Sequence, residues 1–208
     1  MPPLLCAVDV GTRSARAAIV TREGELLARA ESPVALYEPG HGDAEHESED
    51  IWQAVCLAVR GALAGSGAEA ADVAGIAFDA TCSLVVRDRD GRPLPVSAGD
   101  GPLRDTISWI DHRAMDEARR CTATGHPAVA QAGGAMSPER AIPKLLWLKR
   151  HRPESWARAG HIFDLADFLA WRACGSTERS LCTLACKWTY LPNAGGVPGA
   201  GGWQRDFL

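Results

Sequence analysis

The chain has 208 residues, of which 46% are hydrophobic, so it is long enough for one α/β unit with a substantial core. Its net charge of -4 and its scattered Lys and Arg residues offer no basic face, which argues against nucleic acid and anionic membranes as partners and favours a small molecule. We expect no membrane span and no signal peptide, because no apolar run approaches roughly 20 residues, and therefore a cytoplasmic location.

The first elements predicted along the chain are three short strands. Residues 4–10 and 15–20 are apolar runs on either side of a polar turn at Gly11-Thr12-Arg13-Ser14. Glu23-Gly24 is a second turn signal, and residues 26–30 form the third strand. The pattern indicates a three-stranded meander at the start of a mixed sheet.

A polar loop and a long helix come next. Residues 38–50 are rich in Gly, His, Asp and Glu without apolar periodicity, so we expect a solvent-exposed loop that includes Glu45 and His46. Ser48 is suited to cap the following helix. Its apolar stripe, which should pack on the sheet, contains Ile51, Trp52, Val55, Val59 and Leu63.

Strands and helices alternate through the rest of the chain, which indicates an α/β fold with helices on both faces of the sheet. Strands are expected at 73–78, 84–87, 106–110 and 161–163, and helices from Ser137 and from Asp164. Pro143 should kink or restart the first of these helices. Residues 193–202 form a Gly- and Pro-rich connector, and residues 203–208 resemble the first turn of a further element.

The seven cysteines include no C-x-x-C pair and mostly occupy apolar segments, so buried thiols are expected rather than disulfides. Cys182 and Cys186 would share one helical face, but the sequence supplies no second pair of zinc ligands.

The segment from Asp9 to Arg16, D-V-G-T-R-S-A-R, carries the sharpest chemical signal. A carboxylate at a strand end can hold Mg²⁺ through water, and the backbone N–H groups of a tight turn can bind phosphate. A plain β-hairpin is the alternative. Neither a Gly-Lys-Ser/Thr helix start nor G-x-G-x-x-G is present in it, which disfavours a P-loop or a Rossmann fold.

This segment resembles the first phosphate motif of the actin-like ATPase superfamily, in particular of its FGGY carbohydrate kinases. The run from Glu45 to Trp52, E-H-E-S-E-D-I-W, resembles that family's acidic lead-in to its first helix. Residues 79–86 contain T-C-S-L-V, which is similar to a signature of D-ribulokinases. Further matching segments follow in order at residues 109–114, 133–139, 143–149, 164–169 and 179–190. The resemblance covers nearly the whole chain.

The resemblance implies an actin-like, ribonuclease H-like α/β fold and a nucleotide site that binds ATP and Mg²⁺. Asp9 would organise Mg²⁺ and the γ-phosphate, Thr12 would bond the phosphate, and Arg16 would offset its charge. A solvent-facing strand residue is the alternative for Arg16. The remaining residues of the expected phosphate turn are Gly11, Arg13 and Ser14.

The resemblance also implies a pocket for a ketose, whose hydroxyl and carbonyl groups need fixed donors and acceptors. Asp79, Thr81 and Cys82 would line it, and Lys187 would bond a sugar oxygen. Asp111 and Arg113 would lie nearby, although a buried structural ion pair is the alternative for them.

By the same resemblance, residues 1–208 form the N-terminal, sugar-binding domain of a longer kinase, and the catalytic Asp and the ATP-binding domain would lie beyond Leu208. We expect D-ribulose as the substrate, with L-ribulose, ribitol and xylulose as alternatives. The chain alone should then show no efficient phosphoryl transfer. A free-standing module that binds only sugar or another subunit is the alternative. Exposed apolar surface at the docking face would favour a homodimer.

Overall fold

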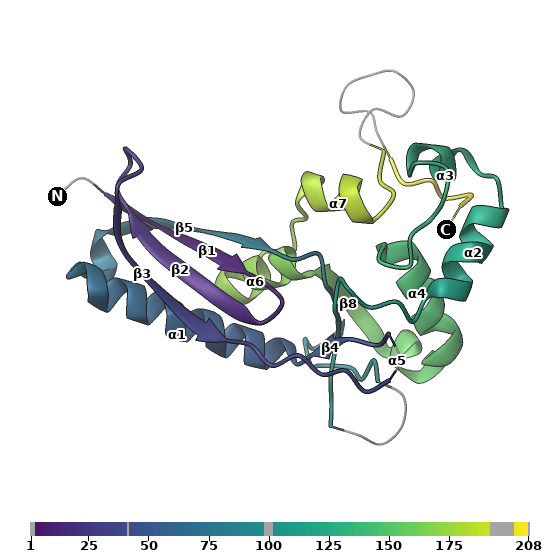
Figure 1. Ribbon diagram of the computed structural model, residues 1–208, viewed down its shortest axis with the longest axis horizontal. Coiled ribbons are helices and arrows are strands. Elements are labelled where there is room, and N and C mark those ends of the chain that lie inside the picture. Colours follow the sequence, from purple (N-terminus) through teal and green to yellow (C-terminus); the bar gives the residue numbers. More distant parts are fainter. Residues whose placement is uncertain (1–2, 41, 98–101, 192–201, 208) are drawn as a thin grey trace.

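The computed structural model describes residues 3–40, 42–97, 102–191 and 202–207. The first sheet consists of β1 (Leu4–Val10), β2 (Ser14–Val20), β3 (Leu26–Pro33) and β5 (Val73–Ala80), in the order β3-β2-β1-β5. β1, β2 and β3 are antiparallel neighbours, and β5 runs parallel to β1. The predicted meander at the start of a mixed sheet is therefore confirmed (Figure 1).

The core lies on one face of this sheet. Cys6, Val8 and Val10 alternate with exposed residues along β1 and are at most 4% exposed. They belong to one apolar cluster with residues of α1 (Ser48–Ser66) and α6 (Leu165–Cys174). The predicted stripe of the first helix is buried in that cluster or packs against it, with Ile51 only 1% exposed.

The opposite face of the sheet differs from the expectation of helices on both faces. Ala7, Asp9 and Arg16 are exposed there, and α1 and α6 contact the sheet through its buried face. In the described part of the chain, that outer face is open because its side chains are mostly small or charged and contribute little apolar area to a helix interface.

The second sheet contains β4 (Glu45–His46), β7 (Thr106–Ile107), β6 (Leu84–Asp88) and β8 (Ala159–Asp164), in the order β4-β7-β6-β8. Its strands pair antiparallel. The expectation that Glu45 and His46 lie in a solvent-exposed loop is wrong, because their exposed fractions are 0% and 2%. Their side chains have internal partners, which for Glu45 include the Arg113 guanidinium at 2.8 Å.

Shorter helices complete the described residues: η1 (Ala70–Asp72), α2 (Met115–Ala123), α3 (Pro127–Gln131), α4 (Ala141–His151), α5 (Pro153–Arg158) and α7 (Leu181–Lys187). The helix expected from Ser137 begins at Ala141, and Pro143 therefore falls in its first turn, where proline is tolerated without a kink. The strand expected at 106–110 is limited to two residues. Most of the predicted connector at 193–202 lies outside the described residues.

The cysteines follow the prediction only in part. Cys6 and Cys121 are buried, but Cys174, Cys182 and Cys186 are exposed. These three lie at the end of α6 and on α7. α7 has no buried residue, which explains why the apolar composition of its sequence does not bury the thiols.

Candidate functional site

The turn between β1 and β2 has the geometry of a tight hairpin. The backbone N–H of Gly11 donates to the carbonyl oxygen of Ser14 at 2.9 Å, and the N–H of Val34 donates to the carbonyl of Arg13 at 2.9 Å. No acceptor for the backbone N–H groups of Thr12 and Arg13 occurs among the described residues. Two adjacent free N–H groups at a turn form a concavity that suits a phosphate oxygen.

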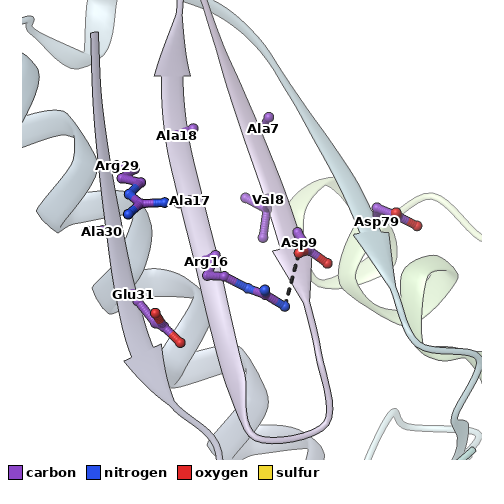
Figure 2. A pocket seen from close by; sticks show the side chains of 10 residues that line it. All are labelled: Ala7, Val8, Asp9, Arg16, Ala17, Ala18, Arg29, Ala30, Glu31 and Asp79. Carbon is purple, nitrogen blue, oxygen red and sulfur yellow. Dashed lines mark ion pairs between the residues drawn. The ribbon is translucent and has the colours of Figure 1, made fainter. Parts of the chain in front are cut away.

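Asp9 and Arg16 face each other across β1 and β2, and their side chains form an ion pair of 3.1 Å (Figure 2). Both side chains are about half exposed, at 56% and 49%, and Asp79 on β5 lines the same groove, which has a volume of about 460 Å³. A Cβ atom at position 11 would lie 2.7 Å from Nη2 of Arg16. Gly11 therefore leaves the space in which the guanidinium lies against the turn.

The groove offers carboxylate oxygens to a magnesium ion that is bound to a nucleotide. Asp9, Glu31 and Asp79 are the carboxylates that line the groove, and the described residues contain no cluster of three or more His, Cys, Asp or Glu that could hold a metal by themselves. Mg²⁺ commonly takes one or two protein carboxylates, with phosphate oxygens and water as its other ligands. These residues fit an ion that arrives with a phosphate.

Arg13 and Ser14 are the other members of the expected phosphate turn. Arg13 and Glu38 form an exposed ion pair of 3.6 Å, and Ser14 begins β2. Such an exposed pair contributes little stability, so Arg13 can change partners at low cost.

The loop that follows β5 lies beside the end of β1. The backbone N–H of Thr81 donates to the carbonyl of Val10 at 3.0 Å, and the N–H of Ser83 donates to the carbonyl of Thr81 at 2.7 Å. Cys82 is half-buried between them, and burial raises the pKa of its thiol to about 11. The thiol therefore stays neutral at physiological pH and is not a thiolate nucleophile.

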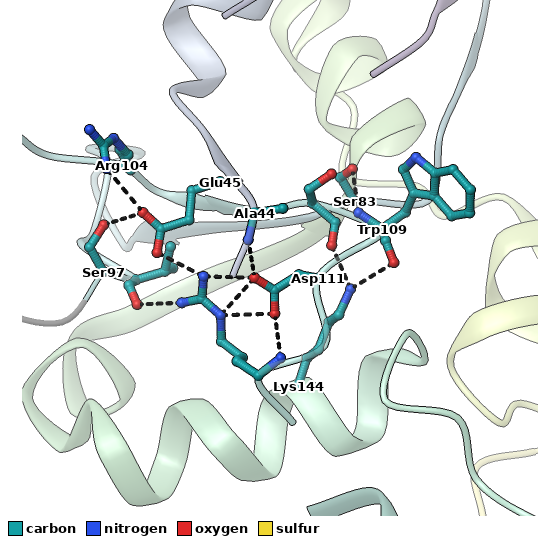
Figure 3. A network of polar contacts seen from close by, with 11 residues as sticks. Ala44, Glu45, Ser83, Ser97, Arg104, Trp109, Asp111 and Lys144 are labelled. Carbon is teal, nitrogen blue, oxygen red and sulfur yellow. Dashed lines mark hydrogen bonds and ion pairs between the residues drawn. The ribbon is translucent and has the colours of Figure 1, made fainter. Parts of the chain in front are cut away.

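Trp109 connects this loop to the phosphate turn. Its indole Nε1–H donates to Oγ1 of Thr12 at 2.9 Å. Its backbone N–H donates to Oγ of Ser83 at 3.1 Å (Figure 3). Its carbonyl oxygen accepts from Nζ of Lys144 at 3.3 Å. One residue thus contacts the hairpin, the loop after β5 and α4.

Lys144 is 1% exposed, and its ammonium also donates to the carbonyl of Ser108 at 2.6 Å. Burial lowers its pKa to about 8, although the negative charge of Asp111 opposes that shift. Neither Lys144 nor Trp109 was predicted as a site residue. The sequence signal available for Trp109 is its place at the start of the segment 109–114, directly before the polar residues 111–113.

Lys187 lies at the end of α7 and lines a small chamber with Cys82, Ser83, Lys144 and Asp164. The structure therefore brings together Lys187 and the loop at residues 81–83. Since Ser83 and Lys144 both bond Trp109, the chamber is joined through Trp109 to Thr12 in the phosphate turn. The predicted pocket and the predicted phosphate turn thus adjoin each other.

Asp164 was predicted to cap a helix, and it does occupy the N-cap position of α6, but its side chain makes no capping hydrogen bond. The carboxyl lies in the chamber instead and is 2% exposed. Burial, helped by the charge of Asp167, raises its pKa to about 7.

Asp111 and Arg113 form the buried structural ion pair that was the alternative for them (Figure 3). Arg113 donates through Nε and Nη2 to the Asp111 carboxylate at 2.8–2.9 Å and through Nη2 to Glu45 at 2.8 Å. The N–H of Ala44 donates to Asp111 at 2.6 Å. The side chains of Asp111 and Arg113 are 0% and 3% exposed, so neither is open to solvent.

Known proteins are similar to this chain over most of its length. Residues 4–187 match the family model described as the FGGY family of carbohydrate kinases, N-terminal domain. An FGGY carbohydrate kinase domain-containing protein of Danio rerio is 50% identical over 189 residues, which cover 90% of this chain and 34% of that protein. A D-ribulokinase of Saccharomyces cerevisiae is 39% identical over 204 residues, which cover 97% of this chain and 28% of that protein.

Solved structures share the fold at low sequence identity. A xylulose kinase from Rhodospirillum rubrum superimposes with a TM-score of 0.68 at 21% identity, covering 81% of this chain and 33% of that one. A glycerol kinase of Plasmodium falciparum, solved with ADP, gives 0.63 at 13% identity and covers 90% of this chain and 41% of that one. The expected actin-like ATPase fold is thereby confirmed.

The chain spans about a third of the length of the curated relatives it matches, between 28% and 35% for the four most similar here. Among the described residues, no helix combines the length and the apolar character needed to cross a bilayer. The match of the family model over residues 4–187 shows that the chain belongs to the FGGY family of carbohydrate kinases, within its N-terminal domain.

Proposed function

We propose that this chain is the sugar-binding N-terminal domain of an ATP- and Mg²⁺-dependent kinase that converts D-ribulose to D-ribulose 5-phosphate. The observation that carries the proposal is the hydrogen bond from Trp109 to Thr12, because it joins the phosphate turn to the sugar pocket. Phosphoryl transfer depends mainly on holding donor and acceptor together in line.

In this proposal the residues have separate roles. The free N–H groups of Thr12 and Arg13, together with Gly11 and Ser14, receive the phosphate, and Arg16 leaves Asp9 to offset its charge. Asp9 then holds Mg²⁺ that arrives with the nucleotide. The ion would neutralise charge on the transferring phosphoryl group. Asp79, Thr81, Cys82 and Lys187 line the sugar side, and Asp111 and Arg113 keep the pocket rigid.

The choice of D-ribulose rests on the T-C-S-L-V run and on the similarity to the yeast D-ribulokinase. The test is calorimetric titration of the 208-residue chain with D-ribulose, L-ribulose, ribitol and D-xylulose. We expect D-ribulose to bind most tightly. Tighter binding of any of the other three would contradict the choice of substrate.

Lys187→Ala provides a second test of the same pocket. We expect D-ribulose affinity to fall by about 10-fold or more, since a hydrogen bond to a charged group contributes about 1.5–3 kcal/mol. The free energy of unfolding should change little, because the Lys187 ammonium forms no hydrogen bond or ion pair with another of the described residues. The matched control is Lys149→Ala on α4. Equal affinity of Lys187→Ala and wild type would remove Lys187 from the pocket.

We further propose that the general base and the ATP-binding domain are supplied by residues beyond Leu208, as the greater length of the relatives suggests. This chain should then bind D-ribulose in the calorimetric titration but show no efficient turnover in a coupled ADP-release assay. Efficient turnover would refute this division of roles. The intact mass of the native protein distinguishes this proposal from a free-standing sugar-binding or subunit-interaction module.

Assembly and location belong to the same proposal. Leu5 and Ile76, which are 41% and 46% exposed on the first sheet, support self-association to a homodimer, and sedimentation velocity tests it. The seven free thiols are compatible with the cytoplasm, which microscopy of the tagged protein would test.

A further inference from the structure

The chamber beside Lys187 has room for a single small group. Its volume is about 10 Å³, which is close to the space that one water molecule requires. Its floor is formed by Ser83, Lys144 and Asp164, which are 0%, 1% and 2% exposed. Cys82 and Lys187 are half-buried and line it as well, so the chamber is reached from the sugar side of the site.

One atom of the chamber lacks a partner. Oδ1 of Asp164 is fully buried and has no hydrogen-bond partner among the described residues. The Trp188 side chain and the Ala166 N–H lie close enough to favour the charged carboxylate, but they do not satisfy Oδ1. A buried acceptor without a partner costs about 1–3 kcal/mol. A hydroxyl that donates a hydrogen bond to Oδ1 removes this cost.

The position of the chamber determines which hydroxyl can reach it. The indole of Trp109 contacts Thr12 in the phosphate turn, whereas the Trp109 carbonyl contacts Lys144 in the chamber wall. The chamber and the phosphate turn therefore lie at opposite ends of one residue. A substrate whose reacting hydroxyl points to the turn directs its far end to the chamber.

We propose that the chamber is a subsite for one hydroxyl of an open-chain ketose, the terminal hydroxyl farthest from the phosphorylated one, and that Asp164 is its acceptor. For D-ribulose this is the hydroxyl on C1. Asp164 thereby selects ligands that carry a terminal hydroxyl at that end, since a substrate without it leaves a buried acceptor unpaired. The inference rests on the proposed function and adds a specificity-determining residue to it.

The test is a thermodynamic cycle that combines the removal of one ligand hydroxyl with the substitution of Asp164. The affinities of D-ribulose and of 1-deoxy-D-ribulose are measured by calorimetry for the wild type and for Asp164→Ala. Removal of the C1 hydroxyl should weaken binding about 10- to 100-fold in the wild type and less than about 3-fold in Asp164→Ala. The 3-deoxy analogue is the matched control ligand, and its loss should be equal in both proteins.

Two further variants, one that conserves the shape of Asp164 and one at an exposed carboxylate, serve as controls. Asp164→Asn retains the shape of the side chain and should show a smaller coupling of the same sign, which covers the case in which Asp164→Ala does not fold. Asp90→Asn, at an exposed carboxylate, should behave as the wild type with every ligand.

The outcomes separate the two proposals. If D-ribulose binds and the loss of the C1 hydroxyl costs the same in the wild type and in the Asp164 variants, the subsite is refuted while the sugar pocket stands. This is also the result expected if only a resting water fills the chamber. If the wild-type chain does not bind D-ribulose, both the proposed function and the subsite are overturned.

Discussion

The buried carboxyl of Asp164 predicts an unusual dependence of stability on pH. Burial is the largest cause that raises its pKa from 3.8 to about 7, and the neighbouring charge of Asp167 adds to it. The positive charge of Lys187 opposes the shift, and the Cys82 thiol next to it is neutral. Between about pH 4 and pH 7, the unfolded chain loses this proton and the folded chain retains it.

The difference in the Asp164 pKa between the folded and the unfolded chain determines the sign and the size of its effect on stability. Because the folded state binds more protons in this range, the contribution of Asp164 to stability decreases as pH rises. The shift from 3.8 to about 7 is roughly 3 pKa units at 1.36 kcal/mol each, so the decrease is up to about 4 kcal/mol. Asp164→Asn has the same shape but cannot titrate, so it should avoid this loss.

Urea unfolding of the wild type and of Asp164→Asn at about pH 4.5, 6 and 8 measures the effect. The free energy of unfolding of the variant minus that of the wild type should increase steadily with pH, while other titrating groups cancel in the difference. Asp90→Asn is the control and should show no such trend. A difference that stays constant from the lowest to the highest pH would refute the reasoning.

Two other substitutions test the neighbouring parts of the site. Lys144→Met removes the cost of a buried ammonium, which is stabilising, but it leaves two carbonyl oxygens without a donor, which is destabilising. Because these effects oppose each other, the free energy of unfolding in urea should stay within about 2 kcal/mol of wild type. D-ribulose affinity by calorimetry should nevertheless fall about 10-fold, because Trp109 loses its contact with α4, and unchanged affinity would contradict this role. Gly11→Ala places a methyl group 2.7 Å from the Arg16 guanidinium, which should weaken the binding of magnesium triphosphate several-fold with a stability change below about 1 kcal/mol. Equal affinity of Gly11→Ala and wild type for magnesium triphosphate in a calorimetric titration would exclude the turn as the phosphate site.

Local patterns predicted the elements that build the site. The apolar runs on either side of residues 11–14 were enough for the hairpin of β1 and β2, since hydrophobic alternation and turn residues act over short distances. The stripe beginning at Ile51 predicted α1 in the same way. The family resemblance, and not these patterns, supplied the ATP, Mg²⁺ and ribulose predictions.

Long-range contacts could not be predicted in this way. Glu45 resembles a loop carboxylate until its partner Arg113 is known, and the two are 68 positions apart. The bond between Trp109 and Thr12 spans 97 positions. Lys144 lies in a helix whose last turn carries Lys149, Arg150 and His151, and nothing in its local sequence indicates which polar groups its buried ammonium contacts. These pairings depend on how the two sheets pack against each other. A short segment of sequence does not carry that information.

The central claim is that nucleotide phosphate and sugar meet at Trp109. Incorporation of 5-fluorotryptophan into the 208-residue chain gives one fluorine signal for each of the seven tryptophans, and Trp109→Phe assigns the signal of interest. The account predicts that magnesium triphosphate, which carries the phosphates of ATP without the nucleoside, and D-ribulose, added separately, each shift the Trp109 signal. A Trp109 signal that stays in place while either ligand binds would contradict it.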